Sequence, residues 1–113
     1  MPEYIQVVTT TPGKAEAEAI ARDLVAQRLA ACAQVLGPIT STYWWQGKIE
    51  TNQEWQCWLK SRRELFEAIQ RAICRLHSYA VPEILAMPVV AGSDSFLAWI
   101  DGELKHGGGP PVG

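Results

Sequence analysis

The chain has 113 residues, 48% hydrophobic and 19% charged, which is typical of a soluble globular protein with one core and no room for two ordinary domains. Its 10 basic and 12 acidic residues argue against binding to the phosphate backbone of nucleic acid. No stretch is long and apolar enough to cross a bilayer, and no basic segment precedes a long apolar run at the start. We therefore expect a cytoplasmic protein without a membrane partner.

Residues 4–10 are rich in β-branched and aromatic side chains and stop at Thr11-Pro12-Gly13, which predicts a strand. Thr11 is expected to cap the helix that follows. That amphipathic helix should end near Leu29, because one face repeats at three- and four-residue steps through Ala17, Ile20, Ala21, Leu24, Val25 and Arg28.

A long hairpin is predicted next. Residues 31–37 and 39–45 indicate a strand interrupted at Gly37-Pro38, because proline cannot donate to a strand ladder and glycine commonly marks a bulge. Gln46-Gly47 turns the chain, and residues 48–60 return as a strand.

The second half repeats the pattern of helix and strand. Ser61-Arg62-Arg63-Glu64 has capping-box spacing, which predicts a helix from there to His77. Residues 83–89 read as a short strand, and Pro88 favours a sheet edge or a strand end. Gly92-Ser93-Asp94 can cap a last helix.

The order β-α-β-β-α-β with a terminal helix predicts an α+β fold of the split βαβ type, in which helices cover one face of an antiparallel sheet. We expect residues 1–105 to form a single domain. Residues 106–113 contain three consecutive glycines and a proline pair, which predicts a flexible tail.

The three cysteines have wide spacings that fit neither a disulfide framework nor a CxxC metal site, so we interpret Cys32, Cys57 and Cys74 as reduced, packed thiols. There is no nucleophile elbow, phosphate-cradling glycine loop or paired-histidine zinc motif. We therefore expect that the protein is not an enzyme and that it needs no cofactor for folding.

Four tryptophans fall on the predicted hairpin, at positions 44, 45, 55 and 58. Alternate strand positions point to opposite faces, so one small helix layer cannot cover them all. We infer that another copy of the chain buries part of this aromatic surface and the open sheet edges. Alternatively, a twisted hairpin curls over its own core.

Chemistry-bearing side chains concentrate in the segment His77-Ser78-Tyr79-Ala80-Val81-Pro82-Glu83. His77 and Glu83 are the best local candidates for holding a divalent metal ion, since imidazole and carboxylate are common ligands. The alternative is structural: the His77 ring donates to a free carbonyl at the helix end while Tyr79 and Pro82 pack a turn.

A second group lies mainly on the hairpin. Glu50, Glu54 and Lys60 form either a salt-bridged row on a strand or part of an intersubunit cleft. The aromatic side chains Tyr43, Trp45 and Trp99 fit core or interface positions, or platforms for a ligand.

Several motifs occur in the order of a known family: Arg28-Leu29-Ala30-Ala31-Cys32, then Tyr43-x-Trp45-x-Gly47-Lys48-Ile49-Glu50, Glu54, Lys60, His77 to Glu83, and Trp99. In these motifs the chain resembles the CutA-type divalent-cation tolerance proteins over almost its whole length. The resemblance implies a ferredoxin-like subunit in a tight homotrimer similar in architecture to the PII signalling proteins. It also implies tolerance to, or binding of, divalent metals, copper above all.

The chain departs from that family pattern at four positions. Thr9 stands where some members have a cysteine that resembles a copper ligand, and Leu76 replaces the first of two histidines. Ser78 and Ala80 also differ from the usual residues. Two functions remain open: a metal-binding tolerance protein using His77 and Glu83, and a PII-like sensor that binds a small anion or metabolite in intersubunit clefts lined by Tyr43, Trp45, Glu50, Glu54, Lys60, Tyr79 and Trp99.

Overall fold

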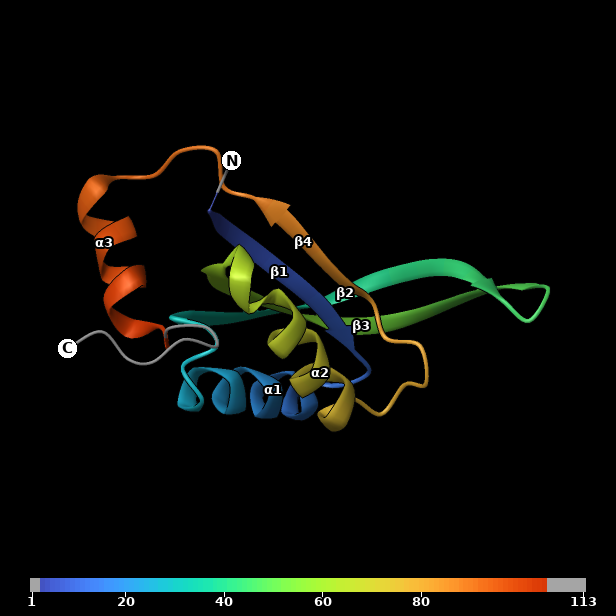
Figure 1. Ribbon diagram of the computed structural model, residues 1–113. Coiled ribbons are helices and arrows are strands. Elements are labelled where there is room, and N and C mark those ends of the chain that lie inside the picture. Colours follow the sequence, from blue (N-terminus) through green and yellow to red (C-terminus); the bar gives the residue numbers. More distant parts are fainter. Residues whose placement is uncertain (1–2, 106–113) are drawn as a thin grey trace.

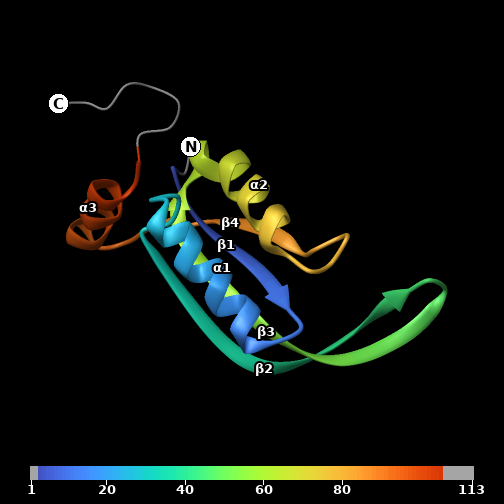
Figure 2. The same cartoon turned by 90° about the horizontal axis from the view of Figure 1, so that it is seen from below.

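The computed structural model describes residues 3–105, in the order β1-α1-β2-β3-α2-β4-α3. The four strands form one antiparallel sheet with the order β2-β3-β1-β4. Helices α1 and α2 lie side by side on one face of this sheet, and α3 lies at the end away from the hairpin tip (Figures 1 and 2). The expected α+β class with an antiparallel sheet is confirmed, and the predicted tail 106–113 lies outside the described residues.

Helix α1 (Lys14–Ala26) differs from its prediction at both ends. Thr11 does not cap it, because Thr11 is the last residue of β1 and its Oγ1 donates to the carbonyl oxygen of Gly13 at 2.8 Å. The helix also ends before Leu29. Arg28 adopts a φ of 57°, and this left-handed residue turns the chain so that Leu29 enters the core.

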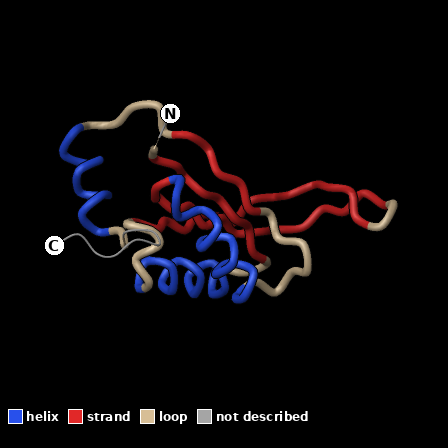
Figure 3. The backbone as a smooth tube through the Cα atoms, viewed as in Figure 1, coloured by secondary structure: helices blue, strands red, loops and turns tan. Residues whose placement is uncertain are grey.

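Strands β2 (Cys32–Trp45) and β3 (Lys48–Arg62) form the long hairpin. The Gln46-Gly47 turn is confirmed, and both residues have positive φ, 51° and 79°, as a tight two-residue hairpin turn requires. The hairpin projects beyond the helix layer, which gives the molecule extents of 52 × 27 × 24 Å (Figures 1 and 3).

The sequence predicted an interruption of the first hairpin strand at Gly37-Pro38. In the structure β2 is continuous there, and only its register with β3 shifts. The pairing of β2 with β3 shifts between Leu36 and Ile39, on either side of Gly37-Pro38. A Cβ atom on Gly37 would lie 2.9 Å from the ring of Trp55, so the hairpin backbone approaches that side chain closely at the shift. Glycine is therefore the residue that fits there.

The capping box predicted at Ser61 is wrong. Ser61 is a buried residue of β3, and its Oγ donates to the carbonyl oxygen of Leu29 at 2.6 Å. Glu64 instead accepts from the Nε atom of Arg62 at 3.1 Å. A 3₁₀ turn follows the strand, and α2 (Phe66–Leu76) begins after it. The tertiary hydrogen bond of the hydroxyl outweighed the local cap.

Strand β4 (Ile84–Pro88) is a sheet edge that ends at its proline, as predicted. Helix α3 (Asp94–Glu103) is capped by Ser93, whose hydroxyl accepts a hydrogen bond from the amide of Phe96 at 3.3 Å, as the sequence predicted. The helix is held to the sheet by Asp101, which accepts from the Tyr4 hydroxyl at 2.6 Å and from Arg62 at 2.5 Å.

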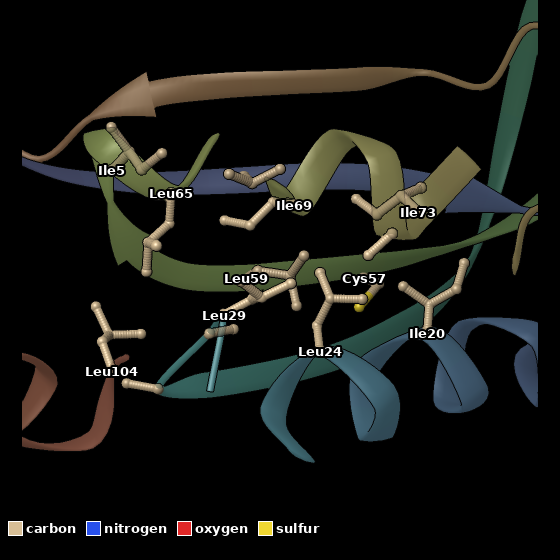
Figure 4. Packing of buried hydrophobic residues seen from close by; sticks show 14 of the residues in the cluster. Ile5, Ile20, Leu24, Leu29, Cys57, Leu59, Leu65, Ile69, Ile73 and Leu104 are labelled. Carbon is tan, nitrogen blue, oxygen red and sulfur yellow. The ribbon is translucent and has the colours of Figure 1, made fainter. Parts of the chain in front are cut away.

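The core lies between the sheet and the two adjacent helices. Ile20 and Leu24 of α1 meet Ile73 of α2 above Cys57 and Leu59 of β3 (Figure 4). All five side chains are fully buried. The two helices therefore fix the central strands, and these strands carry the base of the hairpin.

Candidate functional site

The loop of residues 77–83, between α2 and β4, is hydrogen-bonded to the base of the hairpin. The Tyr79 hydroxyl donates to the Oε2 atom of Glu54 on β3 at 3.0 Å. Burial raises the pKa of Tyr79 to about 12, and the hydrogen bond to Glu54 acts in the same direction. Tyr79 therefore remains a neutral hydrogen-bond donor to this carboxylate at physiological pH.

His77 is buried at the start of this loop, and both of its ring nitrogens have partners. Its Nε2 lies 2.6 Å from the carbonyl oxygen of Thr10, and its Nδ1 accepts the amide of Tyr79 at 3.1 Å. A carbonyl oxygen only accepts, so Nε2 is the donor in the contact with Thr10, while Nδ1 is the acceptor in the contact with the Tyr79 amide. The ring does donate to a carbonyl, but that carbonyl belongs to β1 and not to the end of α2.

Glu16 of α1 connects the first helix to the same loop. Its Oε2 atom accepts from the amide and the hydroxyl of Ser78, at 2.9 and 3.0 Å. The same oxygen lies 3.4 Å from Nδ1 of His77. An imidazole nitrogen and a carboxylate oxygen are thus adjacent, which makes Glu16 a further candidate ligand.

An open cleft of about 930 Å³ separates the loop from the hairpin. We call it the acidic cleft, because three carboxylates and no Lys, Arg or His side chain occur among the described residues that line it. Its lining comprises Thr10, Ser41, Thr42, Tyr43, Trp44, Trp45, Glu50, Asn52, Glu54, Ser78, Tyr79, Ala80, Val81 and Glu83.

The hairpin wall of the acidic cleft is ordered by cross-strand contacts. Tyr43 pairs in register with Glu50, and its hydroxyl accepts from the amide nitrogen of Asn52 at 2.8 Å. Glu54 follows on the same strand and is 7% exposed. The aromatic rings of β2 and the carboxylates of β3 therefore lie on neighbouring strands of this wall.

Six of the nine residues singled out from the sequence lie together in this cleft: Tyr43, Trp45, Glu50, Glu54, Tyr79 and Glu83. His77 is buried beside it. Lys60 is paired with the Oε1 atom of Gln34 at 2.5 Å on the sheet face away from the helices, and Trp99 stacks on Phe96 of α3 at 5.5 Å. That Lys60 and Trp99 belong to an intersubunit cleft stays a prediction.

The sequence interpretation missed Thr10, Glu16 and Asn52. Each makes a hydrogen bond to a residue far away in the chain or across the hairpin, and no local pattern marks such a contact. Within residues 3–105, no three His, Cys, Asp or Glu side chains converge to hold a metal ion. One copy of the chain therefore does not assemble a full ligand set from these residues.

Comparison with known proteins identifies the family of this chain. The profile described as "CutA1 divalent ion tolerance protein" matches residues 5–103. The chain belongs to the CutA1 family. A divalent-cation tolerance protein CutA of Citrobacter koseri is 36% identical over 105 residues, which are 93% of this chain and 91% of that protein.

Solved CutA1-family structures share the fold. CutA from Xylella fastidiosa superposes with a TM-score of 0.88 at 41% identity, covering 91% of this chain and 99% of that one. The protein from Archaeoglobus fulgidus titled a periplasmic divalent cation tolerance protein gives 0.87 at 38% identity, covering 90% and 99%. The family is thus named for divalent-cation tolerance, and the chain's role in such tolerance follows in general terms.

Proposed function

We propose that this CutA1-family chain supports divalent-cation tolerance by binding the ion itself, copper in the first place, through His77 and Glu83 at a subunit boundary. The observation that carries the proposal is the charge of the acidic cleft, where three carboxylates stand without a basic residue among the described lining. Such a surface attracts cations and repels anions. The role is one of binding, without an enzymatic reaction.

The ligand chemistry is compatible with a borderline metal. Binding at Nδ1 of His77 would displace the amide of Tyr79, and the Glu16 carboxylate stands 3.4 Å away as a second ligand. Glu83 is exposed on the loop. Further ligands would come from a second copy, because the described part of one copy holds no complete set.

Titration calorimetry with Cu²⁺ and Zn²⁺ tests this proposal. We expect saturable heat for the chain lacking residues 106–113, whose removal eliminates His106, and loss of that heat in His77→Ala and Glu83→Gln. Glu18→Gln, on the exposed side of α1, serves as the matched control. Glu83 is exposed, so Glu83→Gln keeps the test valid if His77→Ala does not fold. Metal heat that is unchanged in both variants would reject the assignment.

The subunit architecture proposed is a ferredoxin-like fold in a PII-like homotrimer. Large apolar side chains are exposed at the hairpin tip, where Trp44 is 71%, Trp45 49% and Ile49 61% exposed. This exposure argues against a hairpin that curls over its own core. Leu85 and Met87 are exposed on the sheet face away from the helices, and β2 and β4 are open edges of the described sheet. Sister copies would cover these surfaces.

Sedimentation equilibrium at micromolar concentration should give three times the chain mass of 12.5 kDa. Leu85→Glu places a charge on the open sheet face and should shift the mass towards one chain. Ala19→Glu, on the exposed side of α1, should leave the assembly intact. A wild-type chain that sediments as a monomer would contradict the trimer.

The alternative function, a PII-like sensor for a small anion or metabolite, would need positive charge that the described lining of the cleft lacks. Nucleotides added in the same calorimeter test it directly. For location, no helix within residues 3–105 is long and apolar enough to cross a membrane. A cytoplasmic location stays a prediction, since the solved A. fulgidus relative is titled periplasmic.

A further inference from the structure

Tyr79 occupies the ring nitrogen of His77 that a metal ion would bind. Imidazoles that bind metal ions commonly donate their other N–H to a carbonyl, which fixes the ring and leaves one lone pair for the metal. In His77 the Nε2 atom donates to the carbonyl oxygen of Thr10 at 2.6 Å, so the lone pair is on Nδ1. This atom accepts the amide of Tyr79 at 3.1 Å, and the centroids of the two rings are 4.9 Å apart. An ion therefore reaches Nδ1 only if Tyr79 moves away.

The side chain of Tyr79 is tied to the hairpin at its other end. Its hydroxyl donates to the Oε2 atom of Glu54 at 3.0 Å, and Glu54 on β3 is 7% exposed. A buried carboxylate that loses a hydrogen-bond donor is destabilised, because water does not readily replace that donor. Two hydrogen bonds, one at the amide and one at the hydroxyl of Tyr79, thus connect Nδ1 of His77 to the base of the hairpin.

Both hydrogen bonds lie within one copy of the chain. They therefore persist when sister copies cover the hairpin, as in the proposed trimer. The preceding residue, Ser78, is held to α1, since its amide and its hydroxyl donate to Glu16 at 2.9 and 3.0 Å. With Ser78 fixed on the helix side, the contact left to yield when Tyr79 moves is the one with Glu54.

We propose that Tyr79 is a positioning residue that controls ion access to Nδ1 of His77 and couples the occupancy of that nitrogen to the hairpin through Glu54. This role, which rests on the proposed function, is a regulation of the same site. While Tyr79 is bonded to Glu54, its amide stays on Nδ1 and opposes the ion. When an ion takes Nδ1, Tyr79 withdraws and Glu54 loses its donor. The coupling acts in both directions, so whatever holds the hairpin in this arrangement weakens ion binding.

Tyr79→Phe tests the proposal, because it removes the hydroxyl and keeps the ring against His77. All proteins are full-length and carry His106→Gln, which removes the other histidine of the chain. Without an ion, the amide of residue 79 should exchange its hydrogen about tenfold faster than in the wild type, as measured by NMR. In titration calorimetry, Zn²⁺ should bind Tyr79→Phe about three- to tenfold more tightly, since the hydrogen bond that opposes it is already lost.

Tyr43→Phe is the matched control, because it removes a hydroxyl that accepts from Asn52 within the hairpin. It should leave both the exchange rate at residue 79 and the Zn²⁺ affinity unchanged. The side-chain carboxyl carbon of Glu54, observed by ¹³C NMR, measures the coupling to the hairpin. On saturation of the wild type with Zn²⁺, its chemical shift should move towards the value in ion-free Tyr79→Phe.

Three results would overturn the role of Tyr79: an unchanged exchange rate at residue 79 in Tyr79→Phe, Zn²⁺ affinity of this variant equal to or weaker than that of the wild type, or a Glu54 carbon that does not respond to Zn²⁺. If the wild type and Tyr79→Phe bind Zn²⁺ equally, the proposed function stands and the regulation fails. If neither protein gives saturable Zn²⁺ heat, both are rejected.

Discussion

Raising the pH from 9 to 12 is expected to lower the free energy of unfolding by on the order of 4 kcal/mol through Cys57. Burial raises the pKa of this thiol from 9.0 to about 12. Below pH 9 the thiol is protonated in both states. Between pH 9 and 12 it ionises in the unfolded chain and not in the folded one, so the unfolded state gains stability with each unit of pH.

Urea unfolding at a series of pH values, for wild type and Cys57→Val, measures this effect. We first subtract the difference in unfolding free energy between the two proteins at neutral pH. Above pH 9, the unfolding free energy of Cys57→Val should then fall less steeply than that of the wild type. Cys74→Ser is the control, because Cys74 is exposed, and it should follow the wild type. Tyr79, with its pKa raised to about 12, adds a decline above pH 10 that Cys57→Val retains. Parallel curves for wild type and Cys57→Val would contradict the prediction.

Leu59→Ala is expected to lower the free energy of unfolding by about 2–5 kcal/mol. Leu59 lies on the central strand β3, pairs in register with Val7 and Ala33, and is fully buried against both helices (Figure 4). The substitution removes three carbon atoms where strands on both sides hold the backbone, so the cavity cannot close readily.

Chemical denaturation at one fixed protein concentration measures the loss, since assembly would make stability depend on concentration. Leu76→Ala provides the matched control: it removes the same atoms from a side chain that is 40% exposed at the end of α2. Its effect should be less than half as large. Equal losses for the two variants would show that Leu59 does not pack in a closed core.

The order of elements could be predicted because each has a local signal. The Gln46-Gly47 turn, the Ser93 cap and the proline at the end of β4 all follow from residues within a few positions. The start of α2 could not, because a hydroxyl that would cap a helix locally bonds to Leu29, 32 residues away. Local patterns carry no information about such partners.

The sequence singled out residues of the candidate site without showing how they are arranged. It assigned Glu54 and Tyr79 to an intersubunit cleft and Glu83 to a metal site, and the structure brings all three to one cleft of a single copy. The sequence did not reveal that both ring nitrogens of His77 contact backbone groups, because these contacts depend on how the loop packs against β1. The contribution of Glu16 was hidden among the charged residues of an amphipathic helix.

The position of β1 has a consequence for synthesis. This strand precedes the others in the chain, yet it lies inside the sheet between β3 and β4, so it leaves the ribosome with both hydrogen-bonding edges bare. The hairpin of β2 and β3 is local and can form first, but the outer edge of β1 closes only after residues 84–88 have emerged. During synthesis, β1 therefore keeps one unpaired hydrogen-bonding edge until β4 has emerged, and in that interval it is prone to pair with a wrong strand.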